Sequence, residues 1–380
     1  MPRIVDIRSA DDPRDVVHQA VQTLAEGKLI GLPTETGYVA AAHSLQPSAT
    51  ARILNVQRRL GSQRLVLALK NPQEALDYVP RMEGLGRKLI RRFWPGPVTL
   101  QFDVPAPADA REAGLGGALP QEVWRAVAAD DQLALRVPAH ELAFNVLRLL
   151  PAPLVVSGEL RSAGPSLATA QALVSLAGEE LELVIDAGSA RFDQATSHVR
   201  VWSDKWEVIH EGVASSRTLN RLAGNMYLFV CTGNTCRSPM AEGIFRKLLS
   251  ERLHCAEDEL VDRGFIAASA GVAAGPGSPA SPEAVDILRE RGVDLSAHES
   301  QPVTPQLLSQ ADQIFTMTRS HREHLVREFP EIAGRVKLLA RDGADVIDPI
   351  GAGLDEYQRC ADQIERYLRE IVMELPANGN

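Results

Sequence analysis

Residues 230–239 read Val-Cys-Thr-Gly-Asn-Thr-Cys-Arg-Ser-Pro, and this stretch decides how the C-terminal part of the chain folds. An apolar run precedes it at residues 227–230, and apolar residues recur at helical spacing over 240–248. The stretch therefore predicts a strand, a tight loop and a helix. Ser238 suits the N-cap of that helix, and Pro239 suits its first position.

The loop has the chemistry of an anion-binding site with a nucleophile. The residues between Cys231 and Ser238 supply enough backbone N–H groups to surround a tetrahedral anion, and the helix N-terminus favours negative charge there. The guanidinium of Arg237 matches two phosphate oxygens. A thiol beside a helix N-terminus and a cation favours its thiolate form, which attacks a bound phosphoryl group. The predicted loop residues between Cys231 and Arg237 are Thr232, Gly233, Asn234, Thr235 and Cys236.

A structural cysteine or a metal site is the simpler alternative for Cys231 and Cys236. No Cys or His pair at zinc spacing completes a site around them, so we expect no metal. Two interpretations of Cys236 stay open. Its thiol either traps an oxidised Cys231 as a reversible disulfide or is an ordinary buried cysteine.

Together these residues resemble the low-molecular-weight protein tyrosine phosphatases, whose signature is C-x5-R-S, over residues 226–375. The resemblance implies a doubly wound parallel-sheet domain that needs no cofactor. It implies that Cys231 forms a phosphocysteine, that Arg237 holds the phosphoryl oxygens and that Ser238 steadies the thiolate. It also implies a general acid on an Asp-Pro loop, a place that Asp348 fills.

Two departures from the family concern the substrate. Ile350 and Gly351 follow the Asp-Pro pair, where members acting on phosphotyrosine tend to carry aromatic residues. Thr235 stands where many members have an aliphatic residue, and its hydroxyl suits a water or a guanidinium. The loop looks most like the bacterial branch that includes protein arginine phosphatases. Phosphotyrosine and phosphoarginine in a phosphoprotein therefore remain equal alternatives.

The whole chain has 380 residues, which suggests two or three α/β domains. The composition is 45% hydrophobic and 23% charged, so sizeable cores can form, and the net charge of -9 argues against bulk electrostatic wrapping of nucleic acid. No apolar run is long enough for a membrane span, and the first residues do not read as a signal peptide. With four cysteines and a reactive thiolate, we expect a cytoplasmic protein.

The first 200 residues predict alternating helices and strands. Asp12 and Pro13 begin a helix that ends at Gly27. Further helices are expected around 49–59, 85–93, 143–150 and 168–176, and strands around 3–7, 29–32, 65–69, 98–102, 133–137, 154–156 and 183–185. Residues 203–223 look like a transition, with the domain boundary near 222. The expected domains are 1–222 and 223–380.

Three short sequence motifs in the first domain resemble the YrdC/Sua5 family. They lie at residues 32–38, 92–99 and 135–138, and their order and spacing are those of the family. The resemblance implies a twisted α/β sheet with a concave, positive cavity. It implies synthesis of threonylcarbamoyl-adenylate from threonine, bicarbonate and ATP with Mg, for tRNA modification. The expected nucleotide- and substrate-binding residues are Thr34, Tyr38, Arg59, Arg136, Ser157 and Ser197.

The active-site sequence motifs of this domain depart from the family pattern. Gln57 replaces a lysine, which removes a point charge, although Arg58 or Arg64 lies near enough to compensate. The usual Ser-Ala-Asn stretch corresponds to residues 158–160, Gly-Glu-Leu, after Ser157. Two functions therefore stand open. Either the chain is bifunctional, or its N-terminal domain is a non-catalytic nucleotide- or RNA-binding module that regulates the phosphatase.

Overall fold

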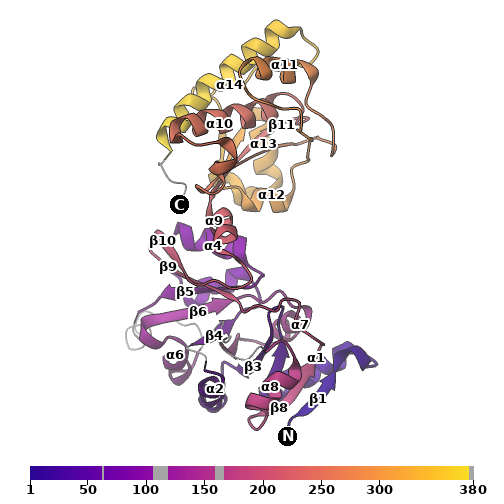
Figure 1. The fold of residues 1–380 in the computed structure, drawn as a ribbon, viewed down its shortest axis with the longest axis vertical. Coiled ribbons are helices and arrows are strands. Elements are labelled where there is room, and N and C mark those ends of the chain that lie inside the picture. Colours follow the sequence, from indigo (N-terminus) through magenta and orange to yellow (C-terminus); the bar gives the residue numbers. More distant parts are fainter. Residues whose placement is uncertain (62–63, 106–118, 159–166, 376–380) are drawn as a thin grey trace. The chain divides into compact units, whose positions relative to one another are not determined.

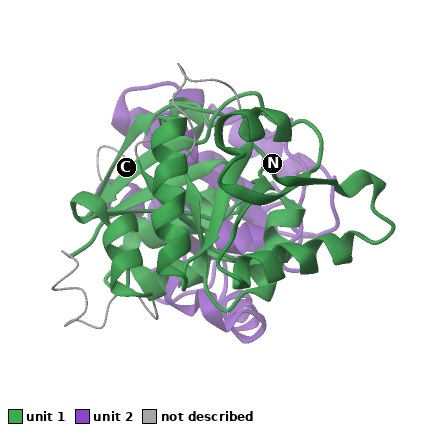
Figure 2. Cartoon of the chain, turned by 90° about the horizontal axis from the view of Figure 1, so that it is seen from below, with its two compact units in different colours: residues 1–218 green, residues 219–380 purple. Residues whose placement is uncertain are grey.

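The computed structural model describes residues 1–61, 64–105, 119–158 and 167–375. The chain divides into two compact units, Met1–Thr218 and Leu219–Asn380, which Figure 2 shows in different colours. Among the helices of the described ranges, none is both long and apolar enough to cross a membrane.

The first unit contains a single large mixed sheet (Figure 1). Its strands are β1 (Arg3–Asp6), β2 (Leu29–Pro33), β3 (Tyr38–His43), β4 (Leu65–Ala68), β5 (Val98–Asp103), β6 (Gln132–Arg136), β7 (Leu154–Ser157), β8 (Leu181–Asp186), β9 (Ser197–Trp202) and β10 (Lys205–His210). They lie in the order β1-β8-β2-β3-β7-β4-β6-β5-β9-β10, with both parallel and antiparallel neighbours. The expected α/β sheet domain is confirmed.

The helices of this unit cover both faces of the sheet. In the described ranges they are α1 (Pro13–Ala25), α2 (Pro47–Leu60), α3 (Ala75–Tyr78), α4 (Gly84–Phe93), α6 (Gln121–Val127), α7 (Glu141–Leu149) and α8 (Ala170–Ala177). The next helix, α9 (Ser216–Ala223), spans the division between the two units. Ile30 and Leu32 of β2 belong to the core that α1 and α7 close. Gly31, between them, faces Leu173 of α8, so α8 lies on the opposite face.

Most predicted elements of the first unit are confirmed, including the cap of α1. The Asp12 side chain accepts a hydrogen bond from the backbone N–H of Arg14, and Pro13 is the first helical residue. Strands β3 and β9 were not predicted. Within the segment 203–223, interpreted as a transition between domains, residues 205–210 form β10, which pairs with β9 at the edge of the sheet. An edge strand is paired on one side only, so the backbone N–H and C=O groups on its other side face water. A strand in this position needs fewer apolar residues than a central strand.

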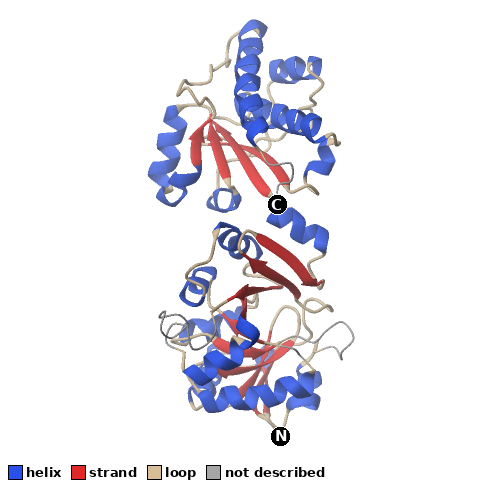
Figure 3. Cartoon of the chain, turned by 90° about the vertical axis from the view of Figure 1, so that its left-hand side faces the viewer, coloured by secondary structure: helices blue, strands red, loops and turns tan. Residues whose placement is uncertain are grey.

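The second unit has a four-stranded parallel sheet, β12-β11-β13-β14, with helices on both sides (Figure 3). Its strands are β11 (Asn225–Cys231), β12 (Phe265–Gly271), β13 (Gln313–Thr316) and β14 (Val336–Leu338), and its helices are α10 (Arg237–Leu253), α11 (Pro282–Glu290), α12 (Pro305–Gln310), α13 (Arg319–Glu328) and α14 (Leu354–Glu374). Short 3-10 turns in the chain are η1 (Ile7–Ser9), η2 (Pro72–Glu74), η3 (Ala129–Asp131), η4 (Glu257–Leu260) and η5 (Pro330–Arg335). The expected doubly wound domain is confirmed.

The order of these strands fixes where a ligand binds. The chain runs from β11 to β12 on one side and then crosses back over β11 to β13 on the other side, so the strand order reverses at β11. Two apolar clusters lie on the two faces, one containing Phe229 and the other containing Leu228 and Val230. Ligands of such sheets bind beyond the carboxyl end of the strand where the order reverses. Cys231 is the last residue of β11.

The expected start of the helix after the loop was wrong. The helix α10 begins at Arg237, and Cys236 occupies the N-cap position without a side-chain cap bond. Ser238 and Pro239 therefore lie in the first turn, where proline is tolerated because its missing N–H has no helical partner. The Ser238 hydroxyl is used for a different purpose, at the sulfur of Cys231.

Candidate active site

The loop between β11 and α10 surrounds the Cys231 sulfur with hydrogen-bonding groups. The Sγ atom lies 2.9 Å from Oγ of Ser238 and accepts the backbone N–H of Asn234 at 3.3 Å. The amide of Asn234 donates to the same Ser238 oxygen at 2.9 Å. The Ser238 hydroxyl donates to the carbonyl oxygen of Ala270 at 3.3 Å and also lies within hydrogen-bonding distance of the sulfur. Ser238 and the Asn234 backbone N–H are thus both in contact with Sγ of Cys231.

Asn234 is the residue that fixes the shape of this loop. Its φ is 56°, in the left-handed region that asparagine adopts more readily than most residues. Its side chain donates to Ser269 at 2.9 Å and accepts the backbone N–H of Gln301 at 2.8 Å. The ring of His298, expected to belong to a structural turn near the site, lies 2.7 Å from the Asn234 carbonyl oxygen. Asn234 is fully buried, so these bonds are protected from water.

The two charged residues of the predicted site lie together. Arg237 Nη2 is 2.7 Å from Asp348 Oδ2, although the residues are 111 positions apart. The arginine side chain is 5% exposed and the aspartate side chain is 50% exposed. The carboxylate is thus the solvent-exposed partner of a nearly buried guanidinium.

Sequence reasoning missed His321 of α13. Its Nε2 lies 2.9 Å from Oγ1 of Thr232, the first residue of the loop. Burial and the nearby Arg237 guanidinium lower the pKa of His321 to about 4, so the imidazole is neutral at pH 7. No local pattern marks this contact, because His321 is 89 residues from Thr232.

Cys236 is buried and lies in a hydrogen-bonded network. Its Sγ is 3.3 Å from the hydroxyl of Tyr357 and 3.4 Å from Oγ of Ser281. Burial, followed by the contact with Cys236, raises the pKa of Tyr357 to about 12, so the phenol stays neutral. The remaining loop residues, Gly233 and Thr235, are half-buried at the mouth of the loop.

In the first unit, Arg136 is enclosed by partners. Its guanidinium lies 2.9 Å from Oε1 of Glu35 and donates to Thr196 at 2.7 Å and to Thr36 at 2.9 Å. Arg136 and Glu35 are both nearly inaccessible, with side chains 6% and 4% exposed. The pair ties the turn between β2 and β3 to the end of β6. Its charge is thus compensated inside the protein.

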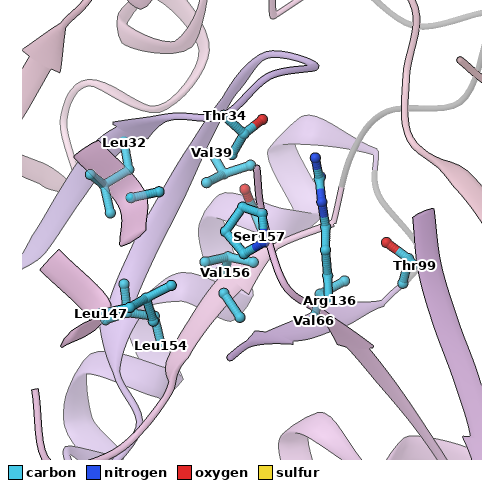
Figure 4. Close-up of a pocket in the computed structure, with 13 residues that line it drawn as sticks. Leu32, Thr34, Val39, Val66, Thr99, Arg136, Leu147, Leu154, Val156 and Ser157 are labelled. Atoms are coloured by element: carbon cyan, nitrogen blue, oxygen red, sulfur yellow. The ribbon is translucent and has the colours of Figure 1, made fainter. Parts of the chain in front are cut away.

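Three of the expected N-terminal site residues line one small pocket, Thr34, Arg136 and Ser157 (Figure 4). Apolar side chains form most of its remaining wall: Leu32, Val39, Val66, Ala68, Ala143, Leu147, Leu154 and Val156. Its enclosed volume is about 30 Å³, which has room for about two water-sized groups. Within the described walls, this slot admits a small side chain but not a nucleotide.

The other three expected residues are used elsewhere. The hydroxyl of Tyr38 donates to the carbonyl oxygen of Gly188 at 2.6 Å, and burial raises the pKa of this phenol to about 12. Arg59 forms an exposed ion pair with Glu179 at 3.2 Å. Ser197 binds backbone groups of residues 212–214. The structure therefore does not bring these three into the pocket of Thr34.

The lysine position of the family is occupied by a buried glutamine. Gln57 is 5% exposed, and its Oε1 accepts the backbone N–H of Gly158 at 3.3 Å. It holds the chain just after Ser157. The candidate counterpart of Ser-Ala-Asn continues into residues 159 and 160, which lie outside the described residues. Arg64, a candidate for the missing charge, pairs with Asp130 at 3.0 Å, and Arg58 donates to Asn55 at 3.4 Å.

Across the described ranges, no group of three or more His, Cys, Asp or Glu side chains is arranged to hold a metal ion.

In the second unit the fold and the site define a class of protein. A thiol held in an anion-binding loop at the reversal point of a doubly wound sheet, with an arginine and an acid beside it, belongs to the cysteine-dependent phosphatases.

Comparisons with known proteins give the families. A profile described as "Low molecular weight phosphotyrosine protein phosphatase" matches residues 227–380. A profile of the Sua5/YciO/YrdC family, described as "Telomere recombination", matches residues 22–212, which is half of the chain. The chain therefore belongs to the Sua5/YrdC family through its first part, and its second part is a low-molecular-weight protein phosphatase domain.

Individual relatives match one part or the other. A protein-arginine-phosphatase of Bacillus subtilis is 37% identical over 152 residues, covering 39% of this chain and 95% of that protein. A probable low-molecular-weight protein-tyrosine-phosphatase of Ralstonia nicotianae is 32% identical, covering 40% and 97%. A threonylcarbamoyl-AMP synthase of Pyrococcus abyssi is 28% identical over 168 residues, covering 44% of this chain and only 45% of that synthase.

Gly271 provides a test of how tightly the loop is packed. It pairs with Cys231 in the sheet, and a Cβ placed there would collide with the Thr232 carbonyl oxygen and lie 2.9 Å from the Asn234 nitrogen. We expect Gly271→Ala to cost about 1–3 kcal/mol of stability by overpacking. Displacing the loop should also reduce kcat/KM for p-nitrophenyl phosphate by about 100-fold.

Thermal unfolding and steady-state kinetics measure both effects. The matched control is Gly275→Ala, since a Cβ at Gly275 would meet nothing within 4 Å. Equal stability and activity of the two variants would show that the loop is not packed as tightly as the structure indicates.

Proposed function

We propose that the second domain hydrolyses phosphorylated side chains of proteins through a phosphocysteine on Cys231. The observation that carries this proposal is the sulfur environment, in which Ser238 and the Asn234 N–H both point at Sγ. Arg237 would hold two phosphoryl oxygens, with the loop N–H groups of residues 232–237 around the rest. We place the start of this functional domain near residue 222, and we expect it to work in the cytoplasm, where thiols stay reduced.

The proposed reaction has two displacement steps. The Cys231 thiolate attacks phosphorus, the S–P bond forms, and the bond to the leaving group breaks while that group takes a proton from Asp348. Water then attacks the phosphocysteine, gives its proton to the Asp348 carboxylate, and phosphate leaves as the thiolate is restored. Phosphoryl oxygens replace Asp348 as acceptors of the Arg237 N–H groups.

We propose phosphoarginine or phosphotyrosine as the substrate, with phosphoarginine favoured by two features. Thr235 is half-buried, and its hydroxyl has only a long contact of 3.6 Å with Sγ of Cys236 among the described residues, which a guanidinium would replace. Ile350, after the Asp-Pro pair, is 62% exposed and offers no aromatic ring for stacking on a tyrosine. The protein-arginine-phosphatase of Bacillus subtilis also shares 37% identity with this part of the chain.

The role of Asp348 is tested by Asp348→Asn. Loss of a general acid should lower kcat/KM by about 100-fold or more for phenyl phosphate, whose leaving group needs a proton, and much less for p-nitrophenyl phosphate. Cys231→Ser serves as the inactive control with both substrates. An equal loss on both substrates would contradict the general-acid role.

The role of Thr235 is tested by Thr235→Val, which keeps the shape and removes the hydroxyl. We expect the ratio of phosphoarginine to phosphotyrosine turnover to fall about fivefold, as for the loss of one hydrogen bond of roughly 1 kcal/mol. The measurement compares kcat/KM for phosphoarginine and phosphotyrosine peptides of identical sequence. An unchanged ratio would remove the hydroxyl from substrate selection.

For the first domain we propose synthesis of threonylcarbamoyl-adenylate from threonine, bicarbonate and ATP, in the service of tRNA modification. The pocket of Thr34, Arg136 and Ser157 supports a threonine site. Threonine carries two small groups on Cβ, a methyl and a hydroxyl, and the pocket has room for about two such groups. ATP would bring Mg with it and lie outside this slot, toward the open side of the domain.

A second candidate function rests on Gln57. An uncharged, buried amide that binds Gly158 cannot supply the charge of the family's lysine. The domain would then hold nucleotide or RNA without chemistry and regulate the phosphatase. The two candidates differ in a single measurable product, pyrophosphate.

We expect the full-length Cys231→Ser variant, given ATP, bicarbonate and Mg, to release pyrophosphate only when threonine is added. Adding Gln57→Lys should raise that rate about tenfold, because a hydrogen bond to a charged group contributes roughly 1.5–3 kcal/mol. A coupled pyrophosphate assay makes the measurement. If neither protein releases pyrophosphate while both bind ATP in calorimetry, the regulatory module is the correct function.

A further inference from the structure

The loop that carries Asp348 has little regular structure of its own. Residues 341–353, between β14 and α14, contain no helix or strand. A loop without such structure must be held by other groups if its side chains are to keep a fixed place. The backbone N–H of Val346 donates to the carbonyl oxygen of Met317 at 2.8 Å, which attaches one point of the loop to the end of β13.

A single side chain of α14 holds the next part of the loop. Gln363 accepts the backbone N–H of Ile347 on Oε1 at 3.0 Å and donates from Nε2 to the carbonyl oxygen of Asp345 at 3.2 Å. One carboxamide thus binds an N–H and a C=O two residues apart, which is how a neighbouring strand would bind this backbone. Cys360, one turn earlier, lies with Sγ 3.3 Å from the carbonyl oxygen of Ile347.

The helix that carries Gln363 is a firm support. It is 21 residues long, and its inner face is buried in the core of the second unit through residues that include Ile364 and Leu368. Side chains on such a helix keep their position better than those on a loop. Gln363 therefore transfers the rigidity of α14 to residues 345–347, immediately before Asp348.

Asp348 itself has few other attachments in the described part of the chain. Its Oδ1 accepts the backbone N–H of Ile350 within the same loop at 3.3 Å, and its Oδ2 pairs with Arg237. In the reaction proposed above, phosphoryl oxygens replace the Asp348 carboxylate as hydrogen-bond acceptors of the Arg237 guanidinium. The position of the carboxyl group during catalysis then depends on the backbone that Gln363 holds.

We propose that Gln363 is a positioning residue for the general acid, acting through the backbone of residues 345–347. This inference rests on the proposed role of Asp348. Gln363 does not touch the phosphoryl group. It sets the distance between the Asp348 carboxyl and the leaving group, and so governs the step in which that group takes a proton.

The test replaces Gln363 in the full-length protein by methionine, which has similar volume but forms neither hydrogen bond. Phosphocysteine formation is followed through kcat/KM with phenyl phosphate and p-nitrophenyl phosphate. We expect Gln363→Met to lower kcat/KM about tenfold for phenyl phosphate and less than about twofold for p-nitrophenyl phosphate, since misplacing a catalytic group by 1 Å costs up to about 100-fold. Gln363→Glu keeps the acceptor for Ile347 and should lie between wild type and Gln363→Met.

The matched control is Gln358→Met on the same helix. Gln358 donates to Asp362 at 3.3 Å, a contact within α14 that does not involve the acid loop. This variant should retain wild-type kinetics with both substrates. Thermal unfolding of each variant separates a local effect from loss of fold, and Gln363→Glu takes the place of Gln363→Met if the latter does not fold.

The outcomes separate this inference from the proposed function. Equal losses on both substrates, or wild-type kinetics of Gln363→Met, would overturn the positioning role while leaving Asp348 as the acid. If Asp348→Asn itself shows no dependence on the leaving group, the proposed role of Asp348 fails, and the inference fails with it. A selective loss in Gln363→Met alongside a larger selective loss in Asp348→Asn supports both.

Discussion

In the proposed reaction, the second domain depends on one constraint, which is that the buried sulfur of Cys231 must carry negative charge. Burial penalises an isolated anion, so hydrogen-bond donors have to be aimed at Cys231 in advance. The Asn234 backbone N–H is one such donor, and the Ser238 hydroxyl lies 2.9 Å from the sulfur. The left-handed Asn234 and the missing Cβ of Gly271 are consequences of this need, because the loop must fold closely around the sulfur.

The two domains place a buried arginine beside acidic partners of different exposure. The Arg237 guanidinium pairs with Asp348, whose side chain is half exposed, and in the proposed reaction phosphoryl oxygens replace that carboxylate. The Arg136 guanidinium pairs with Glu35, and both side chains are almost fully enclosed. Removing one partner of a closed pair leaves an uncompensated charge, so the pair of Arg136 and Glu35 also ties parts of the first domain together.

The phosphatase site is assembled from segments far apart in the chain. β11 and α10 bring the nucleophile and the arginine, while α13 and α14 support the loop threonine and the acid loop. The parallel sheet makes this possible because the carboxyl ends of its strands meet at one edge. In the first domain, segments that are distant in the sequence also meet, and the described residues form a small pocket lined by Thr34, Arg136 and Ser157.

Residue order alone determined the elements with strong local signals. The C-x5-R-S loop, the cap at Asp12 and most of the buried strands could be predicted, because spacing and apolar periodicity are local properties. The Asp-Pro pair predicted Asp348 as the general acid, and in the structure its carboxylate lies 2.7 Å from Arg237. β3 and β9 were missed and β10 was taken for a transition, since pairing partners rather than propensity define them.

Tertiary structure decided the contacts that cross long stretches of chain. His321 against Thr232, Gln363 against the acid loop, and the enclosure of Arg136 by Glu35 and Thr196 have no signature in the sequence. A side chain's role in such contacts depends on which groups the fold places within about 3 Å of it. For that reason the sequence could predict the reacting groups of the phosphatase domain, whereas the contacts of His321 and Gln363 were found only in the folded chain.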